Sequence, residues 1–119
     1  MHELSIARAV VERVEEALAP GQRVLCVTIE IGALSGVVEE ALRFCFDQAT
    51  AGTPLSGCRL EVQAVPVELF CSSCQQTFQP LSRMLCPGCG VPSGELRRGR
   101  ELNILSLEVA DETAHSRAS

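Results

Sequence analysis

The sequence contains no Trp, no Tyr and only four Phe among its 119 residues. A core built from such a chain must be mainly aliphatic. The chain also lacks any run approaching the roughly 18 consecutive apolar residues of a membrane-spanning helix. Its N-terminus has neither the basic start nor the apolar stretch of a signal peptide. We therefore expect a cytoplasmic protein that does not enter a membrane.

Lysine is absent as well, so all ten positive charges are arginines, against fifteen acidic residues and a formal net charge of -5. A negative chain repels a phosphate backbone, so we do not expect a nucleic-acid partner. Only two histidines occur, His2 and His115. Without a histidine base for a Ser or Cys nucleophile, hydrolytic triad chemistry is not expected, and we predict that the protein is not an enzyme.

Cysteine, by contrast, is abundant. Four of the seven cysteines form two pairs, Cys71-Ser-Ser-Cys74 and Cys86-Pro-Gly-Cys89. The odd total and the expected reducing compartment argue against a disulfide framework. Two pairs with this spacing are typical of a tetrahedral four-thiolate site, which predicts structural zinc. Such a closed site has no open position for a substrate, so it indicates a structural role.

Two alternatives remain open from the cysteines alone. Tetrahedral sulfur also suits iron, as in a rubredoxin-like electron carrier. A zinc-ribbon adaptor would explain the same four ligands. The three remaining cysteines, Cys26, Cys45 and Cys58, fall inside predicted elements and are expected to behave as small core residues.

Hydrophobic periodicity predicts two helices. Apolar residues recur at helical spacing over residues 4–19, before Pro20 and Gly21. Ser35 is the predicted N-cap of the second helix, whose apolar stripe precedes Gly52. That predicted stripe consists of Val38, Ala41, Leu42, Cys45 and Ala49.

Alternation predicts three strands, at residues 23–32, 58–65 and 101–109. In the first, Leu25, Val27, Ile29 and Ile31 should share one face. In the last, the alternation shifts near Ile104 and Leu105. Residues 94–99, GELRRG, read as a polar connector.

This order of elements predicts an α+β fold: two helices packed on a small mixed β-sheet, with an inserted zinc-ribbon-like four-cysteine module. We expect residues 1–66 and 99–112 to form an α/β domain. Residues 67–98 should form the zinc-binding domain, and residues 113–119 a disordered tail.

His2 follows the initiating methionine directly. A free terminal amine, the next amide nitrogen and the His2 imidazole can form fused chelate rings, and once the amide is deprotonated they favour a square-planar nitrogen field. Ni(II) and Cu(II) prefer this field. Protons compete with the metal for the amine and the imidazole near neutral pH, so metal affinity should fall as the pH drops.

The ordered set of motifs resembles the HypA/HybF family of nickel metallochaperones, over residues 1–109. The set runs from Met-His-Glu through IEIGALSGV, EEALRFCF and the two cysteine pairs to GRELNILSLEV. The resemblance implies a Ni(II) site at Met1, His2 and Glu3, formed by the terminal amine, the His2 imidazole and the backbone amides of His2 and Glu3. It also implies structural Zn(II) at Cys71, Cys74, Cys86 and Cys89.

The resemblance further implies a HypB-type GTPase as partner and delivery of nickel to the large-subunit precursor of a nickel-iron hydrogenase. We expect a monomer or a weak homodimer. Some family members carry histidines beside the cysteine pairs, whereas this chain has Ser73, Gln75, Val91 and Pro92 there. Exchange of zinc ligands is therefore not expected.

Overall fold

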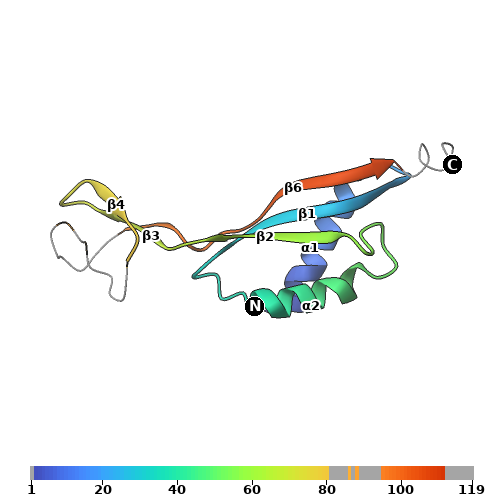
Figure 1. Ribbon diagram of the computed structural model, residues 1–119, viewed down its shortest axis with the longest axis horizontal. Helices are drawn as coiled ribbons and strands as arrows, with labels where there is room; N and C mark the ends of the chain where they lie inside the picture. The colour runs from blue at the N-terminus through green and yellow to red at the C-terminus, as the bar shows by residue number, and fades with distance from the viewer. Residues whose placement is uncertain (1, 81–85, 87, 89–94, 112–119) are drawn as a thin grey trace. The chain divides into compact units, whose positions relative to one another are not determined.

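The computed structural model describes residues 2–80, 86, 88 and 95–111. Two helices and six strands follow one another in the order α1, β1, α2, β2, β3, β4, β5, β6 (Figure 1). Their bounds are α1 Glu3–Ala17, β1 Gln22–Gly32, α2 Glu39–Thr50, β2 Arg59–Val65, β3 Glu68–Cys71, β4 Gln76–Phe78, β5 Glu95–Arg98 and β6 Leu102–Asp111.

The strands form two three-stranded sheets. One has the order β2-β1-β6 and the other β4-β3-β5. The last strand therefore joins the first two, and the cysteine segment is inserted between β2 and β6. The predicted α+β class, with two helices, a small sheet and an inserted module, is confirmed.

The chain divides into two compact units. Unit 1 comprises Met1–Ile29, Val37–Gln63 and Ile104–Ser119, and unit 2 comprises Glu30–Gly36 and Ala64–Asn103. Both helices belong to unit 1, and the second sheet with its cysteines belongs to unit 2. Among the described residues, neither helix is long and apolar enough to cross a membrane.

The core of unit 1 is aliphatic, as the composition predicts. Helix α1 crosses behind the strands in the view of Figure 1 and packs against α2. It buries one face at helical spacing, namely Ile6, Ala7, Val10, Val11 and Val14. It ends at Ala17, close before Pro20, because the residue preceding a proline disfavours helical backbone.

Helix α2 differs from its prediction in two ways. It begins at Glu39, with Val38 as its N-cap, so Ser35 does not cap it. The Ser35 N–H instead donates to the Gly32 carbonyl in a turn, 3.0 Å away. The extended backbone of Val38, a β-branched residue, delays the helix until Glu39.

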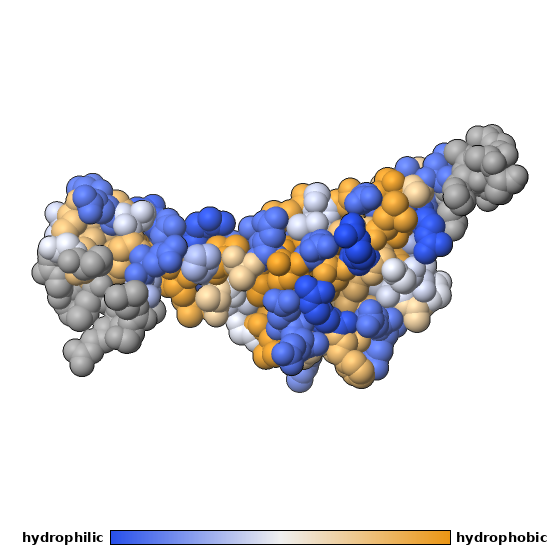
Figure 2. Space-filling view, in the orientation of Figure 1, coloured by the Kyte–Doolittle hydropathy of each residue, from blue (hydrophilic) through white to orange (hydrophobic). Residues whose placement is uncertain are grey.

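The buried stripe of α2 is also rotated from the predicted one. Leu42, Phe46 and Thr50 are buried at four-residue spacing. Val38 belongs to the predicted stripe but is 58% exposed, and Phe44 is 65% exposed. Apolar residues thus reach the surface of this unit, as Figure 2 shows.

The strands of the first sheet depart from simple alternation. In β1 both Cys26 and Val27 are buried while Leu25 is exposed, so the buried side shifts by one residue between them. The predicted face with Leu25, Val27, Ile29 and Ile31 is therefore right only from Val27 onward. In β6 most side chains are exposed, in keeping with its place at the edge of the sheet.

Unit 2 is built on an antiparallel three-stranded sheet. Leu69 of β3 pairs with Phe78 of β4 on one side and with Leu96 of β5 on the other. The predicted polar connector at residues 94–99 is wrong for most of its length, because Glu95–Arg98 forms β5. Its polar side chains fit an edge strand, and the Arg97 guanidinium lies 4.5 Å from the centre of the Phe70 ring.

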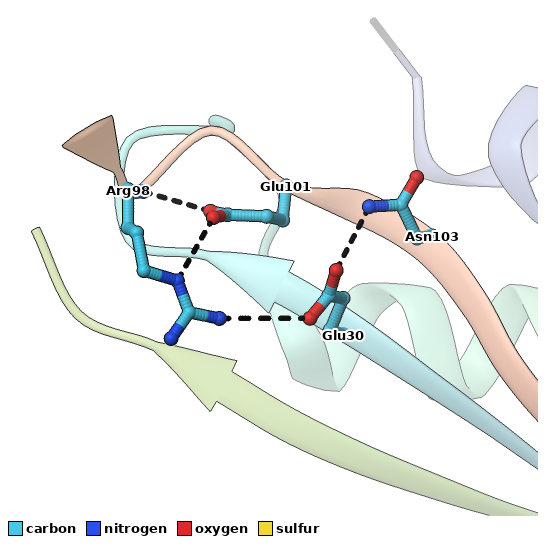
Figure 3. A network of polar contacts seen from close by, with 5 residues as sticks. Glu30, Arg98, Glu101 and Asn103 are labelled. Carbon is cyan, nitrogen blue, oxygen red and sulfur yellow. Dashed lines mark hydrogen bonds and ion pairs between the residues drawn. The ribbon is translucent and has the colours of Figure 1, made fainter. Parts of the chain in front are cut away.

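A polar network within unit 2 links two of the sequence motifs (Figure 3). Glu30 of β1 accepts a hydrogen bond from Asn103 Nδ2 at 2.8 Å and lies 3.9 Å from Arg98. Arg98 also pairs with Glu101 at 3.4 Å. The Gly99 N–H donates to the Glu101 carboxylate at 2.7 Å, and this bond, followed by the one from the Glu101 backbone N–H, lowers the pKa of Glu101.

Backbone hydrogen bonds join the segment after Ile31 to residues 99–101. The Gly32 N–H donates to the Glu101 carbonyl at 2.7 Å, and the Leu34 N–H donates to the Gly99 carbonyl at 2.6 Å. A Cβ on Gly32 would lie only 2.2 Å from Gly99 backbone atoms, so no other residue fits there. The glycines of IEIGALSGV and GRELNIL thus allow the two segments to touch.

The two phenylalanines of α2 give a test of the packing. Phe46→Ala should destabilise unit 1 by about 3–5 kcal/mol, because it leaves a cavity in the core. Phe44→Ala should change stability by less than about 0.5 kcal/mol, because that ring is mostly exposed. Urea unfolding followed by the helical circular dichroism signal measures both, and equal losses would contradict the packing of α2.

The lowered pKa of Glu101 predicts a pH dependence. A carboxyl whose pKa is lower in the folded state stabilises the fold above its ordinary value of 4.5, and this contribution is lost as the pH falls through the folded-state pKa. Glu101→Gln keeps an oxygen that can accept from Gly99 but removes the charge. The difference in urea midpoint between wild type and Glu101→Gln should therefore shrink when the pH falls below 4.5. A constant difference would show that the charge of Glu101 does not matter.

Candidate metal centres

Three of the four paired cysteines come together in unit 2. Cys71 is the last residue of β3, Cys74 follows in the turn to β4, and Cys86 lies beyond β4. Their sulfur atoms all lie within 4.8 Å of one another. Cys71 and Cys86 are buried, and Cys74 packs against them half-buried.

The spacing of the sulfur atoms fits a tetrahedral metal. Cys74 Sγ and Cys86 Sγ are 3.7 Å apart. Zinc–sulfur bonds of about 2.3 Å at tetrahedral angles place two sulfur ligands about 3.8 Å apart. A disulfide would require about 2.05 Å. The donor set is therefore arranged as a metal site, and its geometry admits both zinc and iron.

Local backbone structure brings these sulfur atoms together. Cys71 pairs with Gln76 across the β3–β4 hairpin. The Gln75 N–H donates to the Cys71 carbonyl at 2.7 Å, with Gln75 at φ +57°, so the turn carries Cys74 back toward Cys71. In the second pair, the Gly88 N–H donates to Cys86 Sγ over 3.4 Å, so the backbone turns toward this sulfur atom.

Gly88 also lies close to the sulfur atom of Cys74. A Cβ at this position would lie 3.3 Å from Cys74 Sγ and 3.7 Å from Cys86 Sγ. The backbone at Gly88 thus lies close to two of the three clustered sulfur atoms. Cys89 lies outside the described residues, as do Val91 and Pro92, and its place in the ligand set stays a prediction.

The N-terminal residues form a different kind of candidate site. Met1 lies outside the described residues. His2 is exposed and is the N-cap of α1, with φ -83° and ψ 139°, and Glu3 is the first helical residue. The Ile6 N–H donates to the His2 carbonyl at 3.2 Å, so His2 receives a hydrogen bond of the first turn. The amides of His2 and Glu3 precede the first donors of the helical ladder.

The Glu3 side chain has a partner that sequence analysis did not find. The Val38 N–H, at the N-cap of α2, donates to Glu3 Oε2 at 3.2 Å. This bond, followed by the one from the Glu3 backbone N–H, lowers the pKa of the Glu3 carboxyl. The two residues are 35 positions apart, and no local pattern connects them.

The other expectations concern isolated residues. Cys26 is buried, as expected for a core residue, whereas Cys45 and Cys58 are only half-buried. Burial raises the pKa of the Cys58 thiol, which makes it a poor nucleophile. His115 and the predicted disordered tail lie outside the described residues.

Comparisons with known proteins found relatives that match almost the whole chain. Residues 1–109 match the family model described as hydrogenase/urease nickel incorporation, metallochaperone, hypA. A hydrogenase maturation factor HypA of Roseiflexus sp. (strain RS-1) is 42% identical over 123 residues, covering 100% of both chains. One from Geotalea daltonii is 48% identical over 111 residues, covering 92% of this chain and 99% of its own.

Solved structures show the same fold. The solution structure of the Ni metallochaperone HypA from Helicobacter pylori has a TM-score of 0.60 at 23% identity, covering 91% of this chain and 97% of its own. A second structure, a solution structure of HypA protein, has a TM-score of 0.63 at 23% identity, covering 92% and 93%.

The sulfur cluster predicts the behaviour of a spectroscopic probe. Co(II) added to metal-free protein should give the strong visible absorption of cobalt–thiolate bonds, because the described sulfur atoms lie at distances that suit ligands of one tetrahedral metal. Cys71→Ser should weaken this absorption and lower the affinity for Co(II) at least about tenfold, since it removes a buried ligand. The control Cys45→Ser, on α2 of unit 1, should change neither. Equal losses in the two variants would contradict the site.

Proposed function

The chain belongs to the HypA family of nickel-incorporation metallochaperones for hydrogenase maturation, and from this premise we propose how it carries its cargo. Ni(II) binds at Met1, His2 and Glu3 and is delivered to the large-subunit precursor of a nickel-iron hydrogenase. The donors are the terminal amine, the His2 imidazole and the backbone amides of His2 and Glu3. The family match over residues 1–109 supports this proposal because its description names nickel incorporation.

The observation that carries the proposal is the start of α1. Helical hydrogen bonding begins with the Ile6 N–H donating to the His2 carbonyl. The amide nitrogens of His2 and Glu3 can therefore lose their protons to a metal without breaking a bond of the helix. Helix α1 thus holds Glu3, while its hydrogen-bond ladder does not use the amides of His2 and Glu3 as donors.

The same position suits release of the cargo. His2 is exposed, so a receiving protein can reach the metal directly. Protons compete for the amine, the amides and the imidazole, so each donor that leaves the metal can be protonated in turn. A site that depends on few groups outside the tripeptide can open without unfolding the domain.

Zinc is the resident metal that we propose for unit 2, held by Cys71, Cys74, Cys86 and Cys89. The sulfur spacing supports this assignment, and so does the small core that the described residues of unit 2 form, namely Leu69, Cys71, Phe78 and Cys86. Cross-linking by the metal would compensate for this limited burial. With Ser73 and Gln75 beside the first pair, no histidine there competes as a ligand.

The partners follow from the proposed role. A HypB-type GTPase and the hydrogenase precursor would dock on the protein in the cytoplasm, with the zinc module as a rigid docking surface. The protein itself would act as a monomer or a weak homodimer. No reaction is catalysed in this scheme, because nickel is bound and passed on unchanged.

A nickel titration of untagged protein tests the site. Wild type should bind one Ni(II), with the yellow absorption of square-planar nickel. His2→Ala, and a variant with one residue added before Met1, should each bind at least about tenfold more weakly, because each removes or displaces a nitrogen donor. The control Cys71→Ser should keep nickel binding, because it disturbs only unit 2. Unchanged affinity in the first two variants would refute the assignment.

A further inference from the structure

The Glu3 carboxylate joins the first turn of α1 to the start of α2. Both segments lie in unit 1, where the two helices pack together. The Val38 N–H donates to Glu3 Oε2 at 3.2 Å. The side chain of Glu3 thus links the proposed nickel-binding tripeptide to the start of α2 by a hydrogen bond.

The contact is made at a point where α2 has no cap of its own. Val38 is the N-cap of α2, and its apolar side chain makes no capping hydrogen bond. N-terminal amides of a helix need an outside acceptor, and a carboxylate suits the positive end of the helix dipole. Glu3 supplies one such acceptor from another helix, for the Val38 N–H at the N-cap of α2.

We propose that Glu3 is a positioning residue that couples the N-terminal nickel chelate to α2, so that nickel loading changes the first turn of α2. This inference rests on the proposed function, because it requires nickel at the tripeptide. The carboxylate itself does not bind the metal in this scheme. It holds the backbone of the chelating residues close to Val38, and a movement of that backbone alters the hydrogen bond from the Val38 N–H.

The coupling follows from the place of the carboxylate on the chelating backbone. The Glu3 carboxylate that accepts from the Val38 N–H belongs to the residue whose amide nitrogen would bind Ni(II). Closing the chelate around the metal fixes the backbone of Glu3 and with it the position of this side chain. The bond from the Val38 N–H must then adjust.

The adjustment would change the exposed surface at the start of α2. Val38 is 58% exposed, and Glu39 and Glu40 begin the helix directly after it. A change at the N-cap of α2 therefore alters the side chains that a docking protein can touch. Nickel-loaded and nickel-free forms would present different surfaces at this point although the metal lies on another helix.

Amide NMR of full-length, untagged, ¹⁵N-labelled protein tests the proposal. Square-planar Ni(II) is diamagnetic, so amide signals beside it remain visible. Adding Ni(II) to wild type should shift the Val38 and Glu39 amides. In Glu3→Ala the nickel affinity should fall by less than about tenfold, because the amine, both amides and the imidazole remain, but the shifts at Val38 and Glu39 should be lost.

Two further variants complete the test. Glu3→Gln keeps an oxygen that can accept from the Val38 N–H, so it should retain the response of α2. The control Glu12→Ala, at an exposed position on α1, should behave as wild type. A purely structural role of Glu3 would alter the nickel-free spectrum without affecting the response to nickel.

The outcomes separate the two proposals. If nickel does not bind at the tripeptide of the wild type, the proposed function fails and the coupling fails with it. If nickel binds there but Val38 does not respond, or responds equally in Glu3→Ala, only the coupling is overturned. If Glu3→Ala abolishes the square-planar absorption, the carboxylate is a ligand, and the positioning role is again overturned.

Discussion

The start of α1 is the constraint on which the proposed site depends. The helix begins at Glu3, and its hydrogen bonding begins with the Ile6 N–H and the His2 carbonyl. A helix cannot bond its own first amides, so they are left for other partners. Here those amides belong to the residues next to the terminal amine and the imidazole. One more helical turn at the N-terminus would engage the His2 amide in the ladder.

The two candidate metal sites differ in a way that suits two different tasks. The sulfur atoms of Cys71 and Cys86 are buried in unit 2, and their neighbours include backbone N–H groups and apolar side chains. A metal held there is retained with the fold. His2, in contrast, is exposed at the N-terminal end of α1, so the nickel that we propose there could leave while unit 1 stays folded. Retention in one unit and release from the other are the properties a carrier needs.

Much of this could be predicted from the sequence, and the failures have physical causes. Cysteine spacing and helical periodicity are local signals, so the sulfur cluster and both helices were found. The predicted stripe of α2 placed Val38 in the core and left out Phe46, because which side of the helix meets the core is set by packing with the rest of unit 1. Ser35 does not cap α2, because the chain stays extended at Val38. The short strand β5 has no apolar alternation. The bond between Glu3 and Val38 joins residues far apart in the chain, and only the fold brings them together.

The most direct test of the proposed carrier site is X-ray absorption at the nickel edge of the loaded, zinc-containing protein. The account predicts a four-coordinate, planar site of nitrogen donors with the scattering pattern of one imidazole and no sulfur neighbour. Nickel–sulfur scattering would place the metal on the cysteines of unit 2. That result would contradict a nickel site at Met1, His2 and Glu3.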